Sequence, residues 1–180
     1  MTRHSGTAAG TMTGIINSFR GEYLRYKALA EAAIAQLDEA DLTVADSSGS
    51  NSIAVICWHI AGNLRSRFTD FLTSDGEKPW RHRDEEFEER QVTKEALFQR
   101  WNAGWDVLVK TLDALTDEQV HATVTIRGQS MTVHEALSRS LAHLSYHVGQ
   151  IVYIAKARRG ENFRSLSIPR GASDTFRPKG

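Results

Sequence analysis

The sequence has little cysteine and proline, no excess charge of either sign and no long apolar run. Of its 180 residues one is cysteine and three are proline, which excludes an internal disulfide and allows long helices. Lysine plus arginine equals aspartate plus glutamate at 22 each, so no net field attracts nucleic acid or an anionic membrane surface. We therefore expect a folded domain with no nucleic-acid or membrane partner.

The N-terminus and the apolar stretches predict a cytoplasmic protein. The opening MTRHSGTAAGTMTG has no apolar core of signal-peptide length, and no segment approaches the roughly 18 uninterrupted apolar residues of a membrane-spanning helix. We expect residues 1–12 to be a flexible tail and residues 13–160 to form one domain. Residues 161–180 should pack on that domain or on a partner chain. The single Cys57 lies in an apolar run, which favours packing over reactivity.

Helical periodicity dominates the chain. Apolar residues at steps of three and four predict helices over about 13–37, 52–72, 93–115 and 132–159. The segment ATVTIRG alternates instead and is followed by a turn, so a short β-ribbon should precede the last helix. Four long amphipathic helices must cover their apolar faces with one another, which predicts an all-α four-helix bundle. Gly62, inside the second helix, indicates the close approach of a neighbouring helix or a pocket.

Three of the seven histidines form a candidate metal site. His143 and His147 are four residues apart on the last predicted helix, so their rings share one face and can reach one ion. Most such pairs are solvated or packed, but this pair borders the apolar stripe, where an imidazole needs a partner. A third ligand must come from another helix, and His59 in ICWHIAGN is the best candidate. The alternative for His59 is a core histidine that bonds a backbone carbonyl. We expect the others at the surface, namely His4, His82, His121 and His134.

Three neutral imidazoles would bind zinc, nickel or a similar divalent ion and leave a position open for a water, a thiolate or a substrate carbonyl. Residues one or two helical turns away are candidates for the pocket around the ion, namely Asn63, Arg67, Arg139, Ser140 and Gln150.

The charged loop after the second helix offers further candidates. Arg81 and Arg83 could hold a substrate carboxylate, and the alternative is that this loop pairs with itself. No carboxylate lies at an evident spacing from the histidines, which argues against a hydrolase general base.

The segments WHIAGN, IRGQSMTVHEAL and HLSYHVGQI resemble the DinB/YfiT-like superfamily of bacterial four-helix metalloenzymes. DGEKPWRHRDEEF and SLSIPRGAS are similar to a subfamily of unknown function within it. The resemblance implies an up-down-down-up bundle, a homodimer, and a metal held by His59, His143 and His147. Characterised members include S-transferases and an isomerase that use low-molecular-weight thiols, and hydrolases are proposed.

Together these features favour a metal-dependent enzyme that activates a thiol or a water against a small-molecule substrate, with thiol transfer as the first choice. The alternatives are a metal-dependent hydrolase and a non-catalytic helical dimer with a structural or vestigial metal site.

Overall fold

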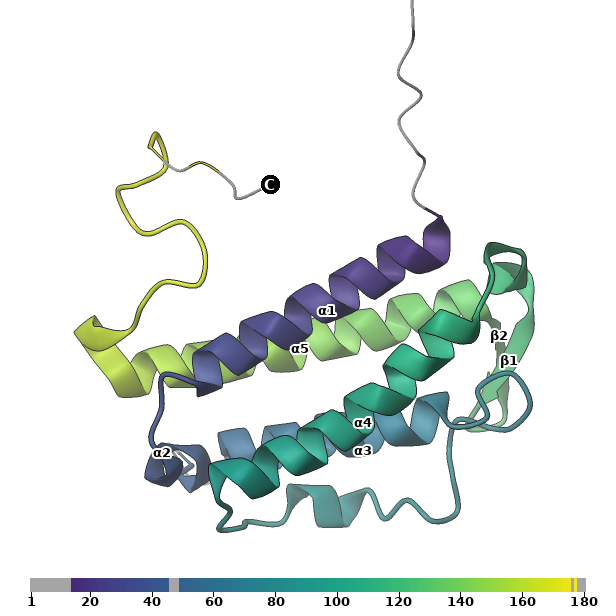
Figure 1. Cartoon of the computed structure of the whole chain (residues 1–180). Coiled ribbons are helices and arrows are strands. Elements are labelled where there is room, and N and C mark those ends of the chain that lie inside the picture. Colours follow the sequence, from purple (N-terminus) through teal and green to yellow (C-terminus); the bar gives the residue numbers. More distant parts are fainter. Residues whose placement is uncertain (1–13, 46–48, 176, 178–180) are drawn as a thin grey trace, which may run out of the picture.

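The computed structural model describes residues 14–45, 49–175 and 177, and the predicted tail at residues 1–12 lies outside them. The described chain is mainly helical, as predicted (Figure 1). Its long helices are α1 (Ile15–Ile34), α3 (Ile53–Phe68), α4 (Lys94–Ala114) and α5 (Val133–Arg159). A two-stranded antiparallel sheet precedes α5, formed by β1 (Thr123–Ile126) and β2 (Gln129–Thr132). The predicted β-ribbon is therefore confirmed.

Capping residues fix the starts of the last two long helices. Thr93 Oγ1 accepts a hydrogen bond from Ala96 N at 3.2 Å, at the start of α4. Thr132 Oγ1 accepts one from Glu135 N at 3.1 Å, while the Glu135 carboxylate accepts one from Thr132 N at 2.7 Å. Such bonds satisfy N–H groups that the first turn of a helix leaves without a partner. The predicted starts of α4 and α5 agree with the structure for this reason.

The ends of the first two long helices were predicted less well. Helix α3 ends at Phe68 and does not extend to residue 72, because Asp70 has a φ of 48°, which no helical residue adopts. Leu72, expected in the apolar stripe, is 39% exposed. Helix α1 ends at Ile34 and is followed by a separate short helix, α2 (Glu39–Thr43). Five residues are too few to produce a periodic signal, so α2 was not predicted.

The four long helices share one apolar core. Helix α1 packs on α5, α3 packs on α4, and α3 also contacts α5. Trp101 and Trp105 of α4 are fully buried in this core. Gly104 lets the backbones of α4 and α3 approach, since a Cβ there would lie 2.7 Å from Ala61 Cα. Helices α3 and α5 therefore present facing surfaces within one packed unit.

Residues 69–93 form the long connection between α3 and α4. In Figure 1, α3 and α4 run in the same direction, opposite to α1 and α5, so the chain must return along the helices before α4 begins. The loop that the sequence predicts here contains a 3-10 helix, η1 (Asp84–Phe87), which contacts α3. A second 3-10 helix, η2 (Asp117–His121), follows α4 and begins with a capping box formed by Thr116 and Gln119. The return of the connection along α3 brings polar side chains of η1 close to the centre of that helix.

The segment after α5 begins with η3 (Gly160–Asn162) and stays in contact with the helices. Phe163 and Leu166 are partly buried against the core. Gln36 accepts a hydrogen bond from Arg164 N at 2.7 Å and donates one to Arg164 O at 3.1 Å. The first part of the predicted C-terminal tail thus lies on the helical domain.

No helix in the described residues combines the length and the apolar character needed to cross a membrane.

Candidate metal centre

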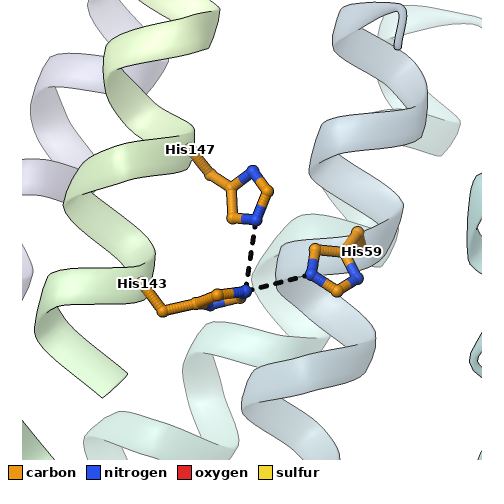
Figure 2. A group of neighbouring side chains, drawn as sticks. All are labelled: His59, His143 and His147. Atoms are coloured by element: carbon orange, nitrogen blue, oxygen red, sulfur yellow. Dashed lines mark hydrogen bonds between the residues drawn. The ribbon is translucent and has the colours of Figure 1, made fainter. Parts of the chain in front are cut away.

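His59, His143 and His147 lie side by side between α3 and α5 (Figure 2). The Nε2 atom of His143 is 3.1 Å from His59 Nε2 and 3.1 Å from His147 Nε2. His59 and His147 are buried, at 4% and 7% exposure, and His143 is partly buried. The helical spacing predicted that His143 and His147 share a face, and packing of α3 against α5 adds His59 to them.

The outer ring nitrogens of two histidines bond to hydrogen-bond acceptors. His59 Nδ1 is 3.0 Å from Glu86 Oε2, and His147 Nδ1 is 2.8 Å from Gln150 Oε1. A carboxylate and an amide oxygen accept hydrogen bonds, so each Nδ1 carries the proton and each Nε2 keeps its lone pair. Histidine ligands of metals in proteins are commonly oriented in this way.

The three Nε2 atoms fit around one cation. A proton on His143 Nε2 could be donated to only one of its two neighbours, which would leave the Nε2 lone pair of the other neighbour without a donor. Nitrogen ligands about 2.1 Å from an ion at a tetrahedral angle lie roughly 3.4 Å apart, close to the 3.1 Å observed. This histidine group could therefore hold a divalent metal ion.

The surroundings keep two of these rings neutral. Burial lowers the pKa of His143 to about 3, and the neighbouring His147 and His59 contribute to the same shift. Burial also lowers the pKa of His147, although its hydrogen bond to Gln150 opposes the change. Because a histidine must be neutral to bind a metal, His143 and His147 need no deprotonation at pH 7.

Glu86 belongs to this candidate site but was not predicted from the sequence, because it does not stand at an evident sequence spacing from the histidines. Besides its bond to His59, its carboxylate accepts two hydrogen bonds from Arg81, at 2.8 and 2.7 Å. Burial raises the pKa of Glu86, but the bonds from Arg81 and His59 outweigh it and hold the pKa below its ordinary value. Glu86 is thus an ionised partner of His59 and Arg81.

Gly62 makes room for this carboxylate. A Cβ at Gly62 would lie 2.0 Å from Glu86 Oε1, so any larger residue would displace it. The close approach predicted at Gly62 is therefore present, but it does not come from a neighbouring long helix. The neighbour is the side chain of Glu86, which belongs to η1.

A cavity of about 380 Å³ adjoins the histidines and is lined by most of the predicted pocket residues. His59 and His143 form part of its wall. The predicted residues that line it are Asn63, Arg67, Arg81, Arg83, Arg139 and Ser140. Gln150 does not line the cavity and instead bonds His147.

The two loop arginines do not form an unpaired clamp for a substrate carboxylate. Arg81 pairs with Glu86, and both side chains are buried, so here the charged loop pairs with itself. Arg83 reaches Asp84 at 3.4 Å on the exposed rim, and its guanidinium lies 4.7 Å from the centre of the Phe87 ring. For Arg81 the structure therefore agrees with the alternative of a charged loop that pairs with itself.

The burial of each side chain tests the remaining predictions for histidine and cysteine. His82, His121 and His134 are exposed, as expected, and His4 lies outside the described residues. Cys57 is buried, and burial raises the pKa of its thiol, in keeping with a packing role.

The chain matches, over residues 11–172, the family described as "Protein of unknown function (DUF1572)". It belongs to this family. The matched range includes the three histidines, Glu86 and the whole arginine-lined cavity of this DUF1572 member. No curated protein matches the chain.

Proposed function

We propose that this DUF1572 protein is a metal-dependent enzyme of the DinB-like type, in which His59, His143 and His147 hold one zinc or nickel ion. The observation that supports it is the convergence of three Nε2 atoms beside an open cavity. A divalent ion bound there would supply a Lewis acid able to activate a thiol or a water. Glu86 and Gln150 hold the Nδ1 protons of His59 and His147, and thereby orient both rings.

The arrangement of the helices supports the DinB-like assignment. Helices α3 and α4 run together and opposite to α1 and α5, as an up-down-down-up four-helix bundle requires (Figure 1). The β1–β2 ribbon before α5 and the histidine positions on α3 and α5 agree with the same arrangement. A bundle of this kind commonly builds its sites from side chains on facing helices.

Transfer of a low-molecular-weight thiol is the first choice of reaction. A thiol has a pKa of about 8.5 and loses its proton far more readily than free water does. A hydrolase would benefit from a general base, yet no acidic side chain lines the cavity, and Glu86 is already bonded to His59 and Arg81. Thiol transfer therefore requires less of the residues that line the cavity than hydrolysis does.

The test is turnover of a thiol by the metal-loaded full chain. Glutathione or cysteine is mixed with chlorodinitrobenzene, and the loss of free thiol is followed with and without the protein. We expect catalysed loss that His147→Ala abolishes and that His134→Ala, an exposed histidine on the same helix, preserves. Cleavage of nitrophenyl esters without thiol consumption would support the hydrolase instead, and the absence of both reactions would reject the enzyme.

A homodimer, with or without catalysis, is the second proposal, supported by an aromatic surface on α5. Tyr146 and Tyr153 are 63% and 76% exposed, and Gly149 lies between them on the same helix. Large exposed aromatic residues are enriched at protein interfaces. We expect sedimentation analysis to show a dimer that Tyr153→Asp weakens. A wild-type monomer at micromolar concentration would contradict it.

A further inference from the structure

Among the residues that the structure describes, five arginines and no acidic residue line the cavity beside the histidines. They come from four separate parts of the chain: α3, the loop after it, the β1–β2 turn and α5. These residues are Arg67, Arg81, Arg83, Arg127 and Arg139. Guanidinium groups gathered from distant segments around one cavity raise the positive potential inside it.

Arg139 stands one helical turn before His143 on α5, about 6 Å along the helix axis. It is exposed, and within the described residues its side chain has no hydrogen-bond or ion-pair partner. A guanidinium that stabilises no neighbouring segment, and that lines a cavity near a candidate metal site, is available to a ligand.

Arg67 and Arg127 share a single carboxylate. Arg67 Nη1 is 3.0 Å and Arg127 Nε is 2.7 Å from Glu77 Oε2. Burial lowers the pKa of Arg67, and the neighbouring Arg81 and Arg127 lower it further, as expected where like charges crowd. Arg67 lies two turns after His59 on α3, about 12 Å along the axis. The two guanidinium groups thus bond one carboxylate between them at the end of the cavity away from the histidines, while the nearby Asp75 carboxylate accepts its hydrogen bonds from backbone N–H groups.

The backbone holds Arg127 in place. It adopts a φ of 54° at the tip of the β1–β2 turn, a conformation that non-glycine residues seldom adopt. Asp75 accepts hydrogen bonds from Arg127 N at 2.9 Å and from Gly128 N at 2.7 Å. The turn is thus bound to the loop after α3, which keeps this arginine at the cavity wall.

The last two arginines keep hydrogen-bonding capacity towards the cavity. Arg81 donates two hydrogen bonds to Glu86, but its Nη1 is buried without a hydrogen-bond partner. Arg83 has as its ion-pair partner only the fully exposed side chain of Asp84 among the described residues, besides its contact with the Phe87 ring. A buried donor without a partner is costly unless a ligand or water satisfies it.

We propose that this cavity binds an anionic small molecule, whose carboxylate or phosphate groups contact Arg139 and the Arg67–Arg127 pair. The fork of an arginine donates two parallel hydrogen bonds to either oxyanion. The inference rests on the proposed function only in placing the reactive end of that molecule at the three histidines. An anion long enough to reach from the metal centre to the arginines would satisfy both ends of the cavity.

The test is calorimetric binding of glutarate and of inorganic phosphate to the full chain, both zinc-loaded and stripped of metal by a chelator. Arg139→Gln removes an exposed side chain, so the variant should fold. Arg25→Gln, at an exposed arginine of α1 that does not line the cavity, is the matched control. We expect Arg139→Gln to weaken binding of the better anion at least about tenfold, with no change in Arg25→Gln.

The uncharged glutaramide is the ligand control and should not bind. Equal binding of glutaramide and glutarate, or unchanged affinity in Arg139→Gln, would overturn the anion site. Tighter binding of glutarate would indicate a carboxylate ligand, and tighter binding of phosphate would indicate a phosphate ligand. Arginine-dependent binding to a protein that takes up no metal would support the anion site and reject the metal enzyme. Metal uptake without anion binding would reject the anion site alone.

Discussion

The two ends of the cavity differ in how completely their polar groups are satisfied. At the histidine end two side chains are buried and the third is partly buried, two are kept neutral, and the outer nitrogens of His59 and His147 have fixed partners. At the arginine end the side chains are more exposed, and Arg67 and Arg127 share one carboxylate. A preorganised site suits a metal ion, whereas one with unused hydrogen-bond donors suits an incoming anion. The four predictions that follow test this difference.

Glu86→Gln should have the largest effect, because it removes the charge that holds the histidine end together. The buried Arg81 would lose its ion-pair partner, which costs about 3 kcal/mol of unfolding free energy. The weaker hold on His59 should reduce metal affinity about 10- to 100-fold. Urea unfolding and a competitive zinc chelator measure the two changes. The exposed neighbour Glu85→Gln is the control, and equal effects of both variants would contradict the role of Glu86.

Acid should destabilise the metal-free protein through His143. The pKa of its folded form is about 3, against 6.5 for a free histidine, so between these values the unfolded chain takes up a proton that the folded chain excludes. The contribution of neutral His143 to the unfolding free energy is therefore fully present above pH 6.5 and is lost as the pH drops towards 3. Between pH 7 and 5 we expect a loss of about 2 kcal/mol from this residue. In urea unfolding, the His143→Gln variant should lack this pH-dependent loss of unfolding free energy. The same pH dependence in the variant and the wild type would contradict the role of His143.

Gly62→Ala should impair the metal site without touching a ligand. The new Cβ would displace Glu86, whose Oε1 would lie 2.0 Å away, and metal affinity should fall about tenfold. Gly21→Ala on α1 is a matched control, because a Cβ there meets nothing within 4 Å. That control should gain up to about 1 kcal/mol of stability and keep its metal affinity. Unchanged zinc affinity in Gly62→Ala would show that Glu86 can move without cost.

Arg139→Gln should have the smallest effect on the fold. Since this side chain is exposed and has no partner among the described residues, the unfolding free energy should change by less than about 0.5 kcal/mol. Metal content should also stay the same. A loss of several kcal/mol in urea unfolding would mean that the arginine end is structural, and the contrast between the two ends would disappear.

The parts of the fold that could be predicted are those with local signals. Thr93 and Thr132 are capping residues, so the starts of α4 and α5 were visible in the sequence. The spacing of His143 and His147, together with the apolar surroundings of His59, was enough to predict all three members of the histidine group. The end of α3 was not predicted, because the break at Asp70 follows from its backbone conformation and no proline or glycine marks it.

The part of the site that could not be predicted depends on contacts between distant segments. Glu86 lies among several other acidic residues in its loop, and nothing local distinguishes it from Glu85. Only the packing of η1 against α3 places it beside His59 and Arg81. Gly62 marked the place where a neighbour would approach, but not which residue it would be. Arg127 was missed for the same reason, since a turn residue carries no sign of the cavity that it lines.

The central claim is that three histidines from two helices hold one metal ion, and elemental analysis combined with X-ray absorption tests it most directly. Protein purified after supply of zinc and nickel should contain about one ion per chain, with nitrogen donors at roughly 2.0–2.1 Å. His143→Ala should lose the ion, and His134→Ala on the same helix should keep it. A wild-type chain that retains no ion, or equal loss in both variants, would contradict the claim.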